Sequence, residues 1–292
     1  MNKDIAKKLH ITTFNDSDAY TNYLFDKLFP SNYFCIKEND SLIAQTFIMY
    51  KKIVFYNKII DIPYIYSLCV EEKYQHQGYG TKLLKKVLNK LANYPFVVLL
   101  TDITKFYTNN GFVVVQDLYI DRNIPINSNI IDFNELLRIY KRKSSSFEIY
   151  GYRDIDYYIE YLNELNMFNE AIYVNKDCYK TNDETVLLNE NKVKPNMHTM
   201  FRICNINKML KLFIYNEPIN LTLNIKDDII KTNNINIKLV NKNTTLTLSK
   251  CSTNNDIIDI SKLSSIIFDK SYISDKFKQL QIKPNIFFID TR

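Results

Sequence analysis

The scarcity of glycine is the feature that most restricts what this chain can fold into. The 292 residues include four Gly and no Trp, whereas Asn and Ile are very abundant. Asn tolerates positive φ, so it can replace Gly in ordinary turns. A glycine that persists in such a sequence therefore points to a position where a β-carbon is excluded. The four glycines are Gly78, Gly80, Gly111 and Gly151.

Length and composition predict a globular protein. At roughly 100–200 residues per domain, the length suggests about two domains. Hydrophobic residues make up 46% and charged residues 24%, which is not the signature of disorder. The net charge is +6, but Lys and Arg are scattered and form no stripe of the kind that nucleic-acid binders carry. We therefore expect no nucleic-acid partner.

The sequence also predicts a cytoplasmic protein that binds no metal ion and does not associate with a membrane. It has no apolar run of membrane-spanning length, and its first residues lack the apolar core of a signal peptide. Its five Cys contain no CxxC pair and only three His accompany them, so we expect no zinc site and no disulfide framework. Reduced thiols are typical of a cytoplasm.

The order of predicted elements indicates an α/β (α+β) fold. Apolar or alternating runs predict strands over 8–14, 32–40, 42–56, 60–70, 95–101 and 112–120. Helices are predicted over 18–29, capped by Asp16 or Ser17, and over 81–93, where leucines share one face. Beyond residue 196, a strand and a helix over 197–213, an antiparallel meander over 220–250 and a helix over 259–269 are predicted.

One stretch carries recognisable chemistry. A strand ends at Val70, a loop with Gly78 and Gly80 follows, and the amphipathic helix then begins. The N-terminus of a helix offers unpaired backbone N–H groups and a partial positive charge, so it can bind a phosphate. The sequence matches neither the P-loop nor the dinucleotide fingerprint. A plain strand-to-helix turn that needs glycine is the alternative explanation.

The spacing Gln75-x-x-Gly78-x-Gly80 resembles the Q/R-x-x-G-x-G/A motif of the GCN5-related N-acetyltransferases (GNAT). The run Phe106-Tyr107-Thr-Asn-Asn-Gly111-Phe112 resembles that family's FYxxxGF signature, and three of the four glycines thus fall at its motif positions. The resemblance implies a mixed sheet flanked by helices and acetyl-CoA as co-substrate. It implies that the following residues hold the coenzyme: Leu68, Cys69, Val70, Gln75, His76, Gln77, Gly78, Tyr79, Gly80 and Thr81.

The resemblance also implies catalytic roles. Tyr107 is the candidate acid for the departing thiolate, although it could simply pack under the helix. The backbone of 68–70 would polarise the thioester. Cys69 is better explained as a buried strand residue than as a nucleophile, because the family transfers the acetyl group directly. His76 is better explained as a loop residue that offers its backbone than as a base.

The whole chain is similar to the Eis-type (enhanced intracellular survival) acetyltransferases. The long hairpin before residue 70, the segment 152–165 and the stretches 194–213 and 257–269 carry this likeness. It implies a catalytic GNAT domain over 1–140, a reduced central region over 141–195 and a sterol-carrier-protein-like α+β domain over 196–292. The resemblance leaves open whether this protein forms a homo-oligomer, because a shortened central region need not keep the interfaces of the family's hexamer.

The Eis resemblance adds a second catalytic residue. In that type the C-terminal carboxylate is thought to act as the base, and here it belongs to Arg292, where an aromatic residue is usual. The sequence thus predicts an acetyl-CoA-dependent N-acetyltransferase that acts on a primary amine of a small molecule or a lysine side chain. The alternative is a non-catalytic protein that binds an apolar ligand or an acyl-CoA through its C-terminal domain.

Overall fold

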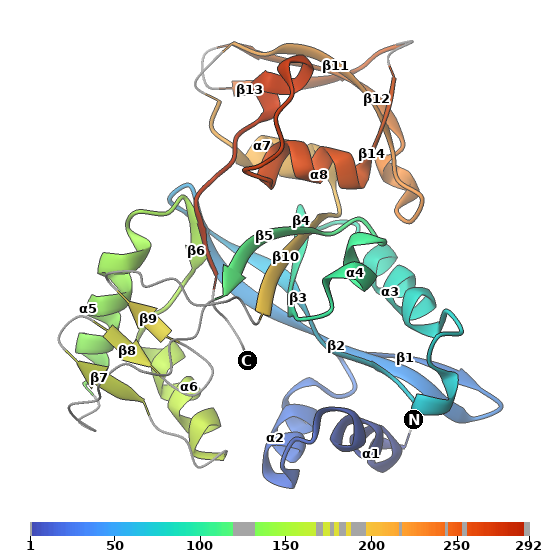
Figure 1. The fold of residues 1–292 in the computed structure, drawn as a ribbon, viewed down its shortest axis with the longest axis vertical. Helices are drawn as coiled ribbons and strands as arrows, with labels where there is room; N and C mark the ends of the chain where they lie inside the picture. The colour runs from blue at the N-terminus through green and yellow to red at the C-terminus, as the bar shows by residue number, and fades with distance from the viewer. Residues whose placement is uncertain are drawn as a thin grey trace.

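A large mixed sheet crosses the middle of the molecule (Figure 1). This computed structural model describes residues 2–118, 132–167, 172–175, 178–180, 185–187, 197–215, 218–242, 245–252 and 256–288. Within them, the eight-stranded sheet has the order β15-β6-β2-β3-β4-β10-β5, and β1 also pairs with β2. Its strands are β1 (Tyr33–Glu38), β2 (Ser41–Phe55), β3 (Lys58–Val70), β4 (Phe96–Thr101), β5 (Val113–Leu118), β6 (Ile149–Gly151), β10 (Met197–Ile203) and β15 (Ile286–Phe287).

Helices cover both faces of this sheet, as expected for the predicted α/β class. On one face lie α1 (Lys3–Phe14) and α2 (Asp18–Leu28), whose buried residues pack with Phe47 and Tyr64. On the other lies α3 (Tyr79–Lys90), whose leucines pack with Ile48, Ile65 and Leu99. The short helices η1 (Glu72–Tyr74) and α4 (Thr104–Thr108) flank α3 in sequence. None of the described helices is long and apolar enough to cross a membrane.

The strand predicted over 8–14 is wrong, because these residues belong to α1. Asn2 caps this helix, and Ala6 and His10 lie on its buried face one turn apart. The hydroxyls of Thr12 and Thr13 donate to the carbonyls of Lys8 and Leu9, four residues back. These bonds satisfy the hydroxyls of two β-branched residues within the helix. The strand is predicted because polar and apolar residues alternate over 8–14.

One local prediction in the first part of the chain is confirmed, and another is displaced by one residue. Ser17 is the N-cap of α2, where its side chain accepts a hydrogen bond from the Tyr20 N–H. The β2–β3 hairpin turns at Tyr56 and Asn57, both with positive φ as a two-residue hairpin requires, and not at the Asn57-Lys58 pair that the sequence suggests, because Lys58 already pairs with Phe55. The structure thus forms the long hairpin whose final strand leads to the glycine loop.

The middle of the chain forms a separate layer beside β6 (Figure 1). It contains α5 (Phe133–Ser144), α6 (Ile155–Met167) and a three-stranded antiparallel sheet of β7 (Tyr173–Asn175), β8 (Cys178–Lys180) and β9 (Thr185–Leu187). The aromatic side chains of Tyr140, Tyr158 and Tyr161 fill the space between the two helices. The described elements of this layer run from Phe133 to Leu187, so the layer begins ahead of the region predicted over 141–195.

The last part of the chain forms a second sheet with the order β13-β12-β11-β14. Its strands are β11 (Asn220–Lys226), β12 (Ile235–Lys242), β13 (Thr245–Lys250) and β14 (Ile257–Asp259), and its helices are α7 (Ile206–Leu212), α8 (Ile260–Phe268), η2 (Lys231–Asn233) and η3 (Asp275–Leu280). The antiparallel meander predicted over 220–250 is confirmed. We call residues 206–282 the C-terminal unit; its helices α7 and α8 lie between its sheet and the large sheet (Figure 1).

Two strands of the last hundred residues lie in the large sheet instead. β10 pairs with β4 on one side and β5 on the other, and β15 pairs with β6. The boundary predicted at residue 196 thus precedes a strand that lies in the middle of the large sheet, between β4 and β5. The division into 1–140, 141–195 and 196–292 stays a prediction.

Candidate active site

The strand that precedes the glycine loop has one open edge. β3 and β4 are paired at Tyr64 and Val98, and β3 then continues to Val70. Beyond Tyr64, no described strand pairs with β3 on the β4 side, whereas Ala44 and Gln45 of β2 pair with Val70 and Cys69 on the other side. The two parallel strands therefore diverge, and the backbone of 66–70 faces the gap between them.

A β-bulge bends β3 at this open edge. Ser67 and Leu68 together oppose the single residue Thr46, and Ser67 has a φ of 53°. The Thr46 hydroxyl donates to the Tyr66 carbonyl at 3.0 Å, which holds the bulge in place. Bulges of this kind re-aim a strand beside a functional site. Sequence analysis missed Ser67 and Thr46, because nothing local in this sequence distinguishes a bulge from a regular strand.

The predicted coenzyme-binding residues run from this edge to the first turn of α3. Cys69 is buried, and burial raises the pKa of its thiol to about 12, so it is not a thiolate nucleophile. The exposed Gln75 side chain donates to the Val70 carbonyl at 3.2 Å and closes the loop back onto the strand. Gln77 likewise donates to the Lys73 carbonyl at 2.8 Å. The side-chain amides of these two glutamines thus hold the loop in its conformation. His76 lies between them, is exposed, and has a φ of 59°.

Gly78 is the N-cap of α3 and has a φ of 86°, a conformation that L residues rarely adopt. A β-carbon there would have no atom within 4 Å, so the space before the helix is open. Gly78 has no side chain to cap the first turn, and that turn carries no acidic residue. The N–H groups of Tyr79, Gly80 and Thr81 therefore present a positive helix end to that open space.

Gly80 lies where the two motifs meet, but a β-carbon is not excluded there, contrary to the expectation for a retained glycine. A β-carbon at Gly80 would lie 3.4 Å from the Phe106 ring and 3.5 Å from Val70. Tyr107 follows on α4, and its ring meets those of Phe106 and Phe112 edge-on at 4.9 and 5.5 Å between centroids. Tyr107 shares an apolar cluster with Leu68, Val70 and Tyr79. The structure therefore brings together residues from β3, α3 and α4.

The hydroxyl of Tyr107 is a hydrogen-bond donor that the fold does not use. No described residue forms a hydrogen bond with it, whereas burial and the nearby Asp102 carboxylate raise the pKa of Tyr107 above its usual range. The phenol is therefore neutral at physiological pH. It can donate a hydrogen bond to a developing anion, but it gives up its proton less readily than an ordinary tyrosine.

The last described residue, Phe288, lies against the same sheet. The Phe288 N–H donates to the Gln116 side chain at 2.7 Å, and its carbonyl accepts from the Thr199 hydroxyl at 2.9 Å. The ring of Phe288 lies 6.2 Å from that of Tyr64, at the level where β3 and β4 are still paired. Arg292, the predicted base, lies outside the described residues.

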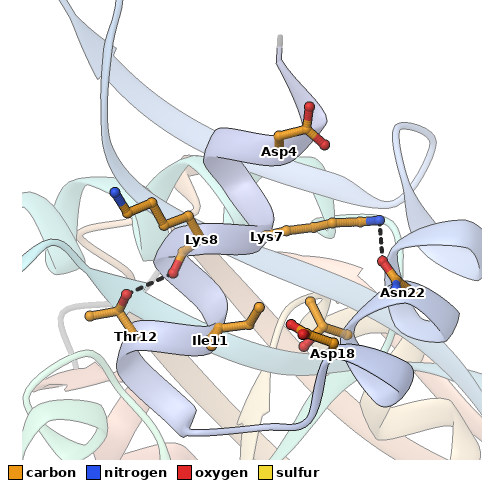
Figure 2. A pocket seen from close by; sticks show the side chains of 8 residues that line it. Asp4, Lys7, Lys8, Ile11, Thr12, Asp18 and Asn22 are labelled. Carbon is orange, nitrogen blue, oxygen red and sulfur yellow. Dashed lines mark hydrogen bonds between the residues drawn. The ribbon is translucent and has the colours of Figure 1, made fainter.

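Two cavities lie away from this cluster. Figure 2 shows one of about 300 Å³ between α1 and α2, lined by Lys7, Ile11 and Asp18 among others. The other, of about 540 Å³, is formed by α2, β2, α6 and the segment before α6. Charge alone does not select an acceptor there, because its lining combines acidic and basic residues, namely Asp154, Asp156, Glu160, Glu164, Lys27, Lys51 and Lys52. Among the described residues, no group of three His, Cys, Asp or Glu could hold a metal ion.

Comparison with known proteins agrees with this geometry. Residues 30–114 match the family model of the acetyltransferase (GNAT) domain. A putative glycylpeptide N-tetradecanoyltransferase of Melanoplus sanguinipes entomopoxvirus is 24% identical over 215 residues, which are 72% of this chain and 71% of the relative.

Solved structures extend the likeness over the whole chain. A GCN5-related N-acetyltransferase from Anabaena variabilis gives a TM-score of 0.70 at 14% identity, over 97% of this chain and 95% of the other. Eis1 from Mycobacterium abscessus gives 0.67 at 11% identity, over 97% and 94%. Such identities show the fold alone. Residues 30–114 therefore resemble a GNAT domain, the whole chain shares the fold of these larger structures, and acyl transfer is the general activity that these likenesses support.

Proposed function

We propose that this protein is an acyl-CoA-dependent N-acyltransferase of the Eis type that transfers an acetyl group directly to a primary amine. The observation that carries the proposal is the open space before α3. There, a positive-φ glycine exposes a helix N-terminus next to the open edge of β3. A pyrophosphate suits the helix end, and an extended pantetheine arm suits the strand edge.

The chemistry follows from the groups on either side of that edge. The bulged backbone of 67–70 would fix the thioester and polarise its carbonyl. The amine attacks that carbon, the C–S bond breaks, and the thiolate leaves with the pair of electrons. Tyr107 would donate a hydrogen bond to this thiolate, because its raised pKa favours donation over complete proton transfer. The amine's proton is taken by a base, for which the C-terminal carboxylate remains the proposal.

The alternative of an apolar-ligand carrier gains no support from the C-terminal unit. Its sheet and helices meet through fully buried side chains, including Leu223, Leu239, Leu263 and Ile267. These side chains form the hydrophobic core of the unit. The sterol-carrier-like fold of this unit remains part of the proposal.

Calorimetric titration with coenzyme A, followed by transfer assays, tests the function. We expect acetyl-CoA to bind and free thiol to appear when a primary amine is added. Tetradecanoyl-CoA and a peptide with an N-terminal glycine belong in the panel, because the name of the curated relative refers to that reaction. If only tetradecanoyl-CoA is turned over, the transferred group in the proposal becomes the tetradecanoyl chain instead of acetyl. Failure to bind any acyl-CoA at millimolar concentration would overturn the proposal.

A further inference from the structure

A fully buried arginine lies behind the turn that carries Tyr107. Arg202 belongs to β10, and its guanidinium forms three hydrogen bonds in three directions. Nε donates to the Asn110 carbonyl at 2.8 Å, Nη1 to the Ile203 carbonyl at 2.9 Å, and Nη2 to the Asp227 carboxylate at 2.8 Å. Arg202 therefore links the active-site turn to the C-terminal unit.

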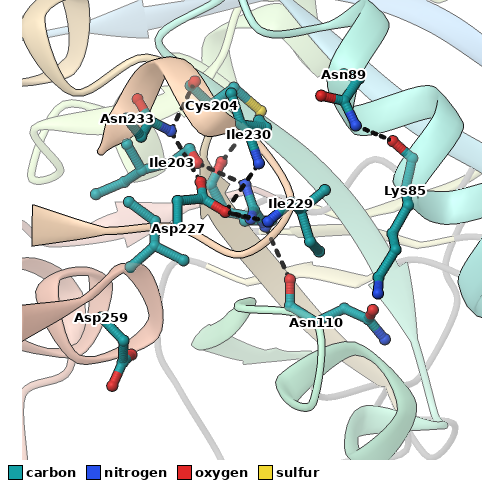
Figure 3. A network of polar contacts seen from close by, with 12 residues as sticks. Lys85, Asn89, Asn110, Ile203, Cys204, Asp227, Ile229, Ile230, Asn233 and Asp259 are labelled. Carbon is teal, nitrogen blue, oxygen red and sulfur yellow. Dashed lines mark hydrogen bonds and ion pairs between the residues drawn. The ribbon is translucent and has the colours of Figure 1, made fainter. Parts of the chain in front are cut away.

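Asp227 is itself held in place from the C-terminal unit. Its Oδ1 accepts from the N–H groups of Ile229 and Ile230 at 2.9 and 3.0 Å, and its Oδ2 accepts from the Asn233 amide at 2.9 Å. Asn233 also donates to the Cys204 carbonyl at 3.0 Å. Figure 3 shows these groups converging on one buried carboxylate. A buried charge with this many partners fixes the position of the guanidinium.

The turn is in direct contact with these groups. Gly111 has a φ of 87°, and a β-carbon there would lie 3.1 Å from both Arg202 Nε and Ile260 Cγ2 of α8. The Asn110 and Phe112 N–H groups donate to the Tyr107 carbonyl at 2.9 and 3.2 Å. Holding the Asn110 carbonyl therefore holds the backbone of Tyr107.

We propose that Arg202, oriented by Asp227, is a positioning residue for Tyr107, so that the C-terminal unit sets the placement of the active-site phenol. The proposal rests on the proposed function. Arginine suits the role because its rigid fork reaches three separate acceptors at once, whereas a lysine ammonium is a point charge on a flexible stem. Misplacing a catalytic group by about 1 Å can cost on the order of a hundredfold in rate.

The test is Arg202→Lys, which keeps the charge opposite Asp227 and loses the fork. We expect kcat to fall about tenfold to a hundredfold with KM for acetyl-CoA unchanged. Hydrogen exchange should become faster in 104–112 and stay unchanged in α3. Leu239→Ala, in the core of the C-terminal unit, is the control: it should lower stability and leave kcat unchanged at temperatures where it is folded. If the lysine variant does not fold, Arg202→Met with Asp227→Leu removes both charges together and carries the same expectation.

A double-mutant cycle shows whether Arg202 acts through Tyr107. On a Tyr107→Phe background, Arg202→Lys should cost little further activity, because the group that it positions is gone. Additive losses, or unchanged exchange in 104–112, would overturn the proposal. An inactive wild-type protein would overturn the proposed function instead, and the exchange measurement would still show whether Arg202 holds the turn.

Discussion

Replacement of Gly78 gives the sharpest test of coenzyme binding, because the structure separates its two effects. The first effect is backbone strain. A non-glycine residue at a φ of 86° costs about 1–2 kcal/mol of stability. The second is obstruction, since the new side chain would project into the open space before α3 and not into the protein.

The size of the binding defect follows from the donors that would be lost. A hydrogen bond to a charged group contributes about 1.5–3 kcal/mol. Loss of two N–H bonds to a pyrophosphate would therefore cost about 3–6 kcal/mol, or more than a hundredfold in Kd. Gly78→Asn isolates this effect, because Asn adopts positive φ with little strain.

Gly80→Ala is the matched control. Its β-carbon would meet Phe106 and Val70 at 3.4–3.5 Å, which is ordinary van der Waals contact. Alanine is also a better helix former than glycine by roughly 0.5–1 kcal/mol. We expect this variant to melt at or above the wild-type temperature and to bind coenzyme A normally.

Calorimetry and thermal unfolding of the three proteins give the answer. Gly78→Asn should remain folded, bind coenzyme A more than a hundredfold more weakly, and bind pantetheine, which lacks the pyrophosphate, as the wild type does. Wild-type affinity of Gly78→Asn for coenzyme A would refute the assignment of the pyrophosphate to the N-terminus of α3.

Three further predictions concern single side chains. Tyr107→Phe should lower kcat by about 10²–10³-fold and leave KM for acetyl-CoA unchanged in steady-state kinetics, because the hydroxyl acts on the leaving thiolate. Cys69→Ala should keep kcat within about twofold of wild type, because burial raises the pKa of the thiol to about 12 and the thiol is therefore not ionised to a nucleophilic thiolate. A large loss of kcat would instead indicate a covalent acyl-cysteine intermediate. Burial raises the pKa of the Glu164 carboxyl, so the stability that this group contributes is complete below its unfolded pKa and is lost as pH rises through the folded value. The melting temperature of Glu164→Gln, measured relative to the wild type, should therefore increase as the pH rises from about 4 to 7. A difference that stays constant across that range would contradict a raised pKa for Glu164.

The parts of the site that the sequence predicts are those with contiguous determinants. Gly78, Gly80 and the amphipathic helix lie within a few residues of one another, so turn and helix signals agree there. Tyr107 is found in the same way, because the glycine that ends its turn follows four residues later. The bulge at Ser67 is missed, since its cause is the pairing with Thr46 across the hairpin and not a residue type.

The determinants of the site that sequence reasoning misses are contacts between segments far apart in the chain: Arg202 lies 92 residues from Asn110 and 25 residues from Asp227. Residues 197–203 alternate well enough to predict a strand, but alternation does not identify its partners, β4 and β5. Within that strand a single arginine would be assigned to the solvent face, because an unpaired buried charge is prohibitive. Arg202 is buried only because Asp227 and the Asn110 carbonyl meet it from two other segments. Gly111 depends on the same distant residues. Its motif position is local, whereas the atoms that would crowd a β-carbon there, at 3.1 Å, belong to Arg202 and Ile260. The glycine of the FYxxxGF turn therefore serves the packing of the C-terminal unit against the large sheet as well as the turn itself.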